Sequence, residues 1–197
     1  MNRAFDILAS VVGLLLLSPL LILISIIILM DTKGPVIFRQ VRAGKNNRDF
    51  RICKFTTMHP GSDKSGLITT GESDRRITRS GQFLRKYKLD ELPQLWNILI
   101  GEMSFVGPRP EVRKYVNLYT ADQMRVLSVR PGLTDYASLE FFHEGEMLAA
   151  SENPEKTYIT DIMPAKLKLN LKYIEEKSPA KNLRILLRTM IKIFGVS

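Results

Sequence analysis

The chain has 197 residues, one cysteine, two histidines and a formal net charge of +9. This length predicts one domain with at most a small appendage, and the positive charge favours anionic partners such as nucleic acid, anionic lipid or a phosphorylated substrate. The single cysteine, Cys53, excludes an internal disulfide, and two histidines far apart in the sequence exclude a Cys/His metal cluster.

The first predicted element is a membrane helix over Ala4–Met30, which is almost entirely apolar. As a helix it would be about 40 Å long, enough to cross a bilayer core of about 30 Å. No small-residue cleavage site follows it, so we interpret it as a retained membrane segment rather than a signal peptide. Ser18 and Pro19 interrupt its middle. Proline cannot donate to the carbonyl of Leu15, which predicts a kink, and a serine hydroxyl can bond a carbonyl freed in this way.

Positive charge lies mostly after this segment, so the positive-inside rule places the rest of the chain in the cytoplasm. Composition alone favours a simple span with the N-terminus outside. Arg3 and Asp6 favour the opposite location for the N-terminus, because leaving them on the cytoplasmic side avoids moving charge across the membrane.

The next two predicted elements are a β-hairpin and a short helix. Val36–Val41 and Phe50–Phe55 alternate apolar and polar residues around a loop rich in Gly and Asn, which predicts the hairpin. Its exposed face carries basic residues, which either form a solvated surface or bind phosphates. Ser80 is expected to cap a helix that runs to about Lys88, with Phe83 on its buried face.

The stretch Lys88–Pro110 contains two adjacent carboxylates, Asp90 and Glu91. A short amphipathic helix is predicted to follow them, with Asp90 at its N-cap. Capping is the ordinary role of such an aspartate. Arg85 and Arg109 on either side change the interpretation, because carboxylates beside arginines suit a phosphate ester that carries a divalent cation.

The C-terminal half of the chain is predicted to be helical. The pattern favours helices from Glu111 to about Val129 and from Pro164 to about Lys177. Asn182–Phe194 predicts a basic amphipathic helix suited to an anionic membrane surface, with a helix packed in the core as the alternative. Its basic residues recur every four positions, at Arg184, Arg188 and Lys192.

Two long motifs of this sequence resemble those of the monotopic phosphoglycosyl transferases, a family of bacterial sugar transferases. They are Leu-Asp-Glu-Leu-Pro-Gln-Leu at Leu89–Leu95 and Met-Ser-Phe-Val-Gly-Pro-Arg-Pro at Met103–Pro110. Shorter blocks at Lys54–Met58, Asp74–Thr78 and Arg130–Thr134 are also similar to family patterns. The resemblance is specific because both long motifs occur together and in order.

The sequence departs from the commoner family pattern after Thr134. Many members continue with Gly-Trp-Ala-Gln, whereas this chain has Asp-Tyr-Ala-Ser at Asp135–Ser138. The role of this divergent segment, which continues to Glu146, stays open. The sugar of the donor therefore cannot be carried over from better-known members.

The resemblance implies an enzyme that transfers sugar 1-phosphate from a UDP-sugar to a polyprenol phosphate, normally undecaprenyl phosphate, and releases UMP. This reaction would be the first membrane step of a bacterial glycan, O-antigen, capsule or exopolysaccharide pathway, on the cytoplasmic face of the inner membrane. In the family an aspartate forms a covalent intermediate with the phosphosugar, and Mg²⁺ neutralises phosphate charge.

Mapped onto this chain, the resemblance makes Asp90 the nucleophile. Asp90 and Glu91 would hold Mg²⁺, and Glu91 could instead manage the proton of the acceptor. The basic residues expected to bind the substrates are Lys54, Arg75, Arg85, Arg109 and Arg130.

The fold that follows is of the α+β class, helix-dominated, with one β-hairpin and several amphipathic interfacial helices. Residues 1–33 would form a re-entrant helix, broken at Ser18 and Pro19, that enters one leaflet and returns. Residues 34–197 would form the cytoplasmic catalytic domain, with membrane lipids as partners and a homodimer left open.

Two other classes of protein are weighed. A membrane-tethered nucleic-acid binder would also be basic, but the aromatic residues are not interleaved with basic ones as base stacking requires. A non-catalytic scaffold is opposed by the intact pair of Asp90 and Glu91.

Overall fold

The computed structural model describes residues 2–32, 34–62, 66, 68–71 and 74–195; Lys33, at the expected domain boundary, lies outside them. The helices are α1 (Arg3–Asp31), α2 (Arg79–Lys86), α3 (Gln94–Ile100), α4 (Arg113–Val116), α5 (Tyr136–Glu140), α6 (Glu144–Ala149), α7 (Pro154–Thr157), α8 (Met163–Glu176) and α9 (Pro179–Phe194). The strands are β1 (Ile37–Ala43), β2 (Asp49–Phe55), β3 (Ser104–Val106) and β4 (Gly132–Thr134). The prediction of a helix-dominated chain with one β-hairpin is confirmed.

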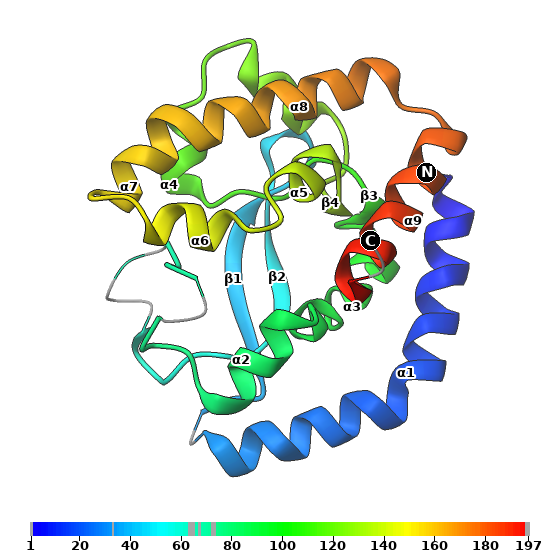
Figure 1. The fold of residues 1–197 in the computed structure, drawn as a ribbon. Helices are drawn as coiled ribbons and strands as arrows, with labels where there is room; N and C mark the ends of the chain where they lie inside the picture. Colours follow the sequence, from blue (N-terminus) through cyan, green and yellow to red (C-terminus); the bar gives the residue numbers. More distant parts are fainter. Residues whose placement is uncertain (1, 33, 63–65, 67, 72–73, 196–197) are drawn as a thin grey trace.

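Helix α1 consists of two limbs that meet at a sharp bend about halfway along it (Figure 1). Pro19 lies within the helix, and the hydroxyl of Ser18 donates to the carbonyl of Leu15 at 2.8 Å. The predicted kink is confirmed, and the serine satisfies the carbonyl that proline cannot. Most apolar side chains of α1 face outward, with Leu15 and Leu16 69% and 74% exposed.

Both ends of α1 are bonded to the rest of the molecule. Near its start, Arg3 donates to two carbonyls at the C-terminal end of α3, and the buried carboxylate of Asp6 accepts a hydrogen bond of 2.9 Å from the hydroxyl of Ser104. At its end, the carboxylate of Asp31 accepts from the backbone N–H of Ser80 at 2.9 Å. The apolar helix therefore leaves the globular part and returns to it.

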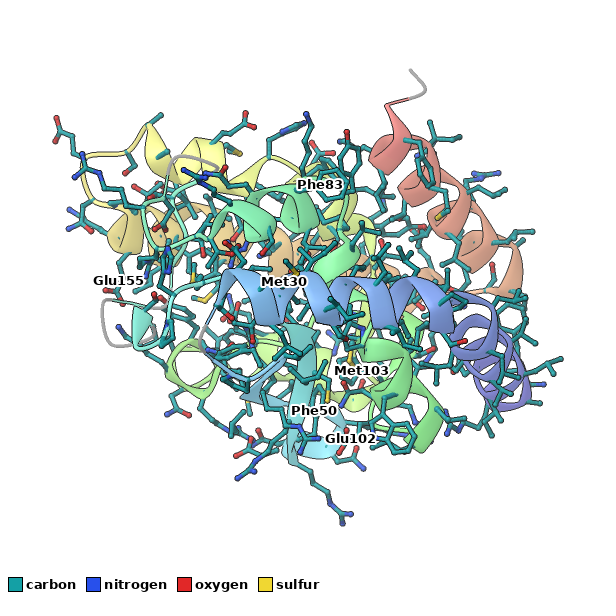
Figure 2. The ribbon with its side chains drawn as sticks, turned by 90° about the horizontal axis from the view of Figure 1, so that it is seen from below. Met30, Phe50, Phe83, Glu102, Met103 and Glu155 are labelled. Carbon is teal, nitrogen blue, oxygen red and sulfur yellow. The ribbon has the colours of Figure 1, made fainter. Side chains whose placement is uncertain are left out.

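The second limb of α1 packs across the hairpin and α2. Ile28 of α1, Phe55 of β2 and Leu84 of α2 belong to one buried cluster. Figure 2 shows this limb running past α2, which bears the labelled Phe83, and past the hairpin, which bears the labelled Phe50. The limb buries one side against the protein and leaves the other side open.

The predicted hairpin is present, with strands Ile37–Ala43 and Asp49–Phe55, and it is joined to α3. Strands β1 and β2 are antiparallel, with Ile37 opposite Phe55 and Ala43 opposite Asp49. The side chain of Asn97 on α3 accepts from the backbone N–H of Cys53 at 2.9 Å. This bond between a side chain and a strand fixes α3 against β2, which matters because the acidic pair lies just before α3.

A small parallel pair, β3 and β4, was not predicted from the sequence. Ser104 lies opposite Gly132, and Val106 lies opposite Thr134. A Cβ at Gly132 would lie 2.1 Å from the backbone nitrogen of Gly107, so only glycine permits this approach of the two chains. The pair brings the Gly-Pro-Arg-Pro turn against the segment that follows residue 130.

Two predicted helices need correction. The segment Glu111–Val129 contains only α4 and a 3₁₀ turn at Gln123–Ser128. The reason is local, because Thr120 and Gln123 bond each other's backbone N–H groups with their side chains and begin a new turn.

The boundaries and buried face of α2 also differ from the prediction. Its N-cap is Thr78 rather than Ser80, since the Thr78 hydroxyl accepts from the N–H of Gly81 at 3.0 Å. Phe83 is exposed rather than buried.

Both predicted C-terminal helices occur, but each begins earlier than predicted. Helix α8 continues from α7 through a π-helical turn at Tyr158–Ile162, so Pro164 does not begin it, and α9 begins at Pro179 rather than Asn182. Ile185 and Leu186 of α9 pack in the cluster of Val106 and Tyr173. Five other large apolar side chains of α9 are more than half exposed: Leu183, Leu187, Met190, Ile191 and Phe194. The core-packed alternative therefore accounts for only one edge of α9.

Candidate active site

The acidic pair lies in a buried 3₁₀ turn, Leu89–Glu91, that the chain enters through Lys88 in a left-handed conformation with φ 56°. The predicted N-cap role of Asp90 is wrong, because α3 begins later, at Gln94, with Pro93 as its cap residue. Proline has no N–H to donate, which fits it for that position. The carboxylate of Asp90 is therefore not engaged in capping the helix.

Glu91 is held by two cations. Its Oε1 accepts from Lys54 Nζ at 2.9 Å. Both terminal nitrogens of Arg109 also donate to its carboxylate, Nη2 to Oε1 and Nη1 to Oε2, the latter at 3.1 Å. Burial alone would raise the pKa of Glu91, but the charges of Arg109 and Lys54 outweigh it and hold that pKa well below its ordinary value. Glu91 is therefore ionised and organises the basic side chains of the site.

Asp90 is buried, and its Oδ1 has no hydrogen-bond partner among the described residues. Burial raises the pKa of Asp90, while the charges of Lys54 and Arg85 oppose this rise and that of Glu91 adds to it. Arg85 is itself positioned by a bond of 2.9 Å from its Nε to the hydroxyl of Thr57. A carboxylate oxygen without a partner, close to fixed cations, suits an electrophile or a metal ion.

Arg109 is fixed through its backbone as well as its side chain. Its N–H donates to Oδ2 of the fully buried Asp135 at 3.1 Å. On either side of it, the carbonyl of Pro108 accepts from Gly132, and that of Pro110 accepts from Arg42, both at 3.0 Å. The guanidinium is thus presented by a rigid turn, which reduces the entropy lost when it binds an anion.

A cavity of about 1330 Å³ joins these groups to an apolar region. Lys54, Arg85, Asp90, Glu91 and Arg109 line its polar part. Apolar side chains from α1 and α9 line another part, among them Phe5, Leu17, Met190 and Phe194. One space therefore joins a cluster of cationic side chains to an apolar surface.

Two of the predicted substrate-binding residues do not reach this cavity. Arg75 is exposed, and its neighbour Arg76 is the one that bonds internally, to Asp74 at 2.6 Å. Arg130 donates from Nε to the carbonyl of Gly101 at 3.0 Å, at the C-terminal end of α3. Neither Arg75 nor Arg130 lines the cavity.

The side chains fit a magnesium ion in part. Among the described residues there is no group of three or more His, Cys, Asp or Glu that could hold a metal. Mg²⁺ in phosphate-transfer sites usually takes one or two carboxylates and draws its other ligands from substrate phosphates and water. The carboxylate of Asp90, which has an oxygen without a partner among the described residues, fits this role, whereas both oxygens of Glu91 are already bonded.

Asp135 is a residue that sequence reasoning missed. Its Oδ1 accepts from the N–H of Ser138 at 2.6 Å and caps α5, while its Oδ2 holds Arg109. An aspartate placed just before a short helix is a capping pattern that could have been recognised. Its second bond, to a turn far away in the sequence, could not.

Comparison with known proteins gives a consistent result. The family model described as bacterial sugar transferase matches residues 1–196. A UDP-N-acetylgalactosamine-undecaprenyl-phosphate N-acetylgalactosaminephosphotransferase of Aeromonas hydrophila is 43% identical over 141 residues, which are 70% of this chain and 33% of that protein. A UDP-glucose:undecaprenyl-phosphate glucose-1-phosphate transferase of Caulobacter vibrioides is 34% identical over 192 residues, 96% of this chain and 68% of that protein.

An exopolysaccharide production protein PSS of Rhizobium leguminosarum bv. phaseoli is similar over nearly its whole length. It is 35% identical over 198 residues, which are 97% of this chain and 94% of that protein. By contrast, the chain spans only 33% of the Aeromonas relative and 27% of a glucose phosphotransferase of Komagataeibacter xylinus. The match over residues 1–196 shows that the chain belongs to the bacterial sugar transferase family.

Proposed function

We propose that the protein transfers sugar 1-phosphate from a UDP-sugar to undecaprenyl phosphate and releases UMP. The observation that carries this proposal is the free oxygen of Asp90 beside Lys54, Arg85 and Arg109, in a cavity that is also apolar. The names of the relatives from Aeromonas and Caulobacter support the same substrate classes.

In the first step, Asp90 Oδ1 attacks the sugar-proximal phosphorus of the donor. A new bond forms between the carboxylate oxygen and phosphorus, and the bond from phosphorus to the UMP oxygen breaks, so that UMP leaves with the electron pair. Arg109, Lys54 and Arg85 offset the charge that develops on the phosphate oxygens. The product is an aspartyl phosphosugar at Asp90.

In the second step, a phosphate oxygen of undecaprenyl phosphate attacks the same phosphorus and displaces the carboxylate of Asp90. The acceptor approaches along the apolar part of the cavity, which suits its hydrocarbon chain. One diphosphate linkage is exchanged for another, so the overall reaction should lie near equilibrium and be drawn forward by later enzymes.

We also propose that the site uses Mg²⁺, which would be held by the second carboxylate oxygen of Asp90 and the substrate phosphates, and by Glu91 once Arg109 turns to a phosphate. The ion would supply neutralisation of the two repelling phosphates. The residues of this chain orient the phosphates and exclude water from the acyl phosphate. A shift in melting temperature with Mg²⁺ and UMP together, absent in Asp90→Asn, would support this ligand role without measuring turnover.

Asp90→Asn tests the central step, since the amide is nearly isosteric but a poor nucleophile. UMP release from a UDP-sugar, undecaprenyl phosphate and Mg²⁺ should fall by about a thousandfold or more. Wild type without acceptor should retain radiolabelled sugar phosphate, and the variant should retain none. Asp122→Asn, at an exposed carboxylate, is the matched control. Near-normal turnover in Asp90→Asn would remove Asp90 from the nucleophile role, and no UMP release from wild type would favour a scaffold.

We further propose that α1 is re-entrant, so that residues 34–197 and the N-terminus share the cytoplasmic side. The bonds of Arg3 and Asp6 at one end and of Asp31 at the other support this topology, because all three lead to the same globular part. The exposed apolar side of α9 would lie in the same membrane surface.

Labelling of a cysteine placed at Asn2 tests this topology. With Cys53 replaced by Ser, intact cells carrying Asn2→Cys should not react with a membrane-impermeant thiol reagent, and lysed cells should. Efficient labelling from outside would establish a simple span instead.

A further inference from the structure

Two polar atoms in one wall of the cavity are buried without a partner among the described residues. They are Ser138 Oγ on α5 and Asn170 Oδ1 on α8, two helices that pack together. Asn170 is only 5% exposed. Buried polar groups in folded proteins almost always have a hydrogen-bond partner, so two unpaired atoms in a cavity wall indicate a place for a ligand.

This wall is tied to the phosphate-binding turn by a single buried side chain. Asp135 accepts from the N–H of Ser138 at 2.6 Å through one carboxylate oxygen and from the N–H of Arg109 at 3.1 Å through the other. Asn170 and Arg109 also line the same small hollow beside the main cavity. Ser138 and Asn170 are therefore held close to the phosphate that Arg109 is placed to bind.

We propose that Ser138 and Asn170 form a subsite for hydroxyl groups on the sugar ring of the donor. This assignment rests on the proposed function. Attack by Asp90 on the sugar-proximal phosphorus puts that phosphate beside Arg109, and the sugar is bonded to it directly. The nucleoside lies one phosphate farther away.

The chemistry of the wall matches a neutral sugar. A ring hydroxyl donates to Oδ1 of Asn170, and a neighbouring hydroxyl can donate to or accept from Oγ of Ser138. One pair of charged groups on this side of the cavity is already bonded, since Lys166 donates to Glu144 at 2.7 Å. Ser138 is the last residue of the stretch Asp135–Ser138, where this chain departs from the commoner family pattern.

The test compares donors and donor analogues on the purified full-length chain, with UMP release as the readout. The preferred UDP-sugar is identified from a panel, and analogues that lack one ring hydroxyl are then measured on wild type, Ser138→Ala and Asn170→Leu. Removal of a hydroxyl that bonds Asn170 should raise the KM of wild type by about threefold to tenfold. The same removal should change the KM of Asn170→Leu by less than about twofold.

UMP inhibition distinguishes the sugar from the nucleoside. The inhibition constant of UMP should be unchanged in both variants, which also shows that they are folded. Tyr173→Phe is the matched control, because it removes a buried hydroxyl from α8 that bonds Val106 and Asn182 outside the cavity. This control should discriminate among donors as wild type does.

Three outcomes would overturn the assignment in different ways. If UMP inhibits Asn170→Leu more weakly than wild type, by the same factor by which the KM for the whole donor rises, Asn170 contacts the nucleotide rather than the sugar. If wild type is active and both variants discriminate among deoxy donors as wild type does, Ser138 and Asn170 do not form the subsite. The proposed function would then still stand. If wild type releases UMP from none of the UDP-sugars, both the subsite and the proposed function are wrong. If Asn170→Leu does not fold, the result with Ser138→Ala decides.

Discussion

Lys54 is the cation that serves both carboxylates of the site. Its ammonium bonds Glu91 at 2.9 Å, and its charge also opposes the rise in the pKa of Asp90. Burial lowers the pKa of Lys54, and the negative charge of Glu91 works against that change. The three groups therefore set one another's protonation, and a change to one should be visible in the titration of another.

Replacing Lys54 with Met should move the acid limb of the pH–activity profile to higher pH. In the proposed mechanism Asp90 must be ionised to attack. A neighbouring positive charge favours the ionised form, so removal of that charge raises the pKa of Asp90 further. The measurement is kcat/KM for UMP release across pH. Turnover should also fall by about tenfold to a thousandfold at neutral pH through lost phosphate neutralisation. Lys45→Met, at an exposed lysine of the same hairpin, is the control. An unshifted limb would contradict this role.

Helix α1 owes its shape to two neighbouring residues in its middle. Pro19 removes a donor, and Ser18 satisfies the carbonyl of Leu15 that loses it. A straight helix of this length would extend about 44 Å, which would carry its two ends far apart. The bend is thus what allows Arg3 and Asp31 to reach the same globular part.

Pro19→Ala should straighten α1 and release its first limb from the protein. We expect a larger fraction of chains to label from outside at a cysteine placed at Asn2, with UMP release reduced in proportion. Leu16→Ala, at an exposed position of the same helix, should change neither quantity. A Pro19→Ala protein that labels as wild type does would show that the contacts of Arg3 and Asp6 hold the bend by themselves.

Sequence patterns predicted the elements that depend on local information. The β-hairpin and the kink at Ser18 and Pro19 both occur as predicted (Figure 1). The prediction of one helix over Glu111–Val129 was wrong. Apolar residues keep a helical spacing beyond Thr120 and Gln123, although these two residues begin a new turn. The strand pair β3 and β4 could not be predicted, since each strand is short and their pairing is non-local.

The chemistry of the candidate site could be predicted from the sequence, but the residues that form it could be predicted only in part. The motif placed Asp90, Glu91 and Arg109 in one stretch, and the structure brings Lys54 and Arg85 to them. From residue type and motif position alone, Arg75 and Arg130 could not be distinguished from the basic residues that do line the cavity. Their distance from the cavity results from how α3 and the loop before α2 pack, which no local pattern records.

A contact between the N-terminal helix and the middle of the sequence links distant parts of the molecule. Asp6 is 1% exposed and accepts from Ser104 at 2.9 Å, at the first residue of β3. The parallel partner of β3 leads directly into Asp135, which fixes Arg109. The apolar helix is therefore connected through β3 and β4 to the turn that presents the guanidinium.

Asp6→Ala should lower the free energy of unfolding by about 1–3 kcal/mol, because the Ser104 hydroxyl loses its acceptor inside the protein. The measurement is thermal unfolding in detergent for Asp6→Ala, Ser104→Ala and the double variant. In a double-mutant cycle the two losses should not add, since each variant removes the same bond. Additive losses would show that the Asp6–Ser104 bond contributes nothing measurable to stability.

The bend in α1 has a mechanical consequence for the lipid around it. A helix whose limbs enter and leave through one surface displaces lipid from that leaflet and none from the opposite one. Two coupled leaflets of unequal area curve toward the larger one, so in the proposed re-entrant topology the protein would act as a shallow wedge. At high density it should gather where the bilayer is already curved outward on its own side, and vesicles of decreasing diameter should bind it with increasing affinity.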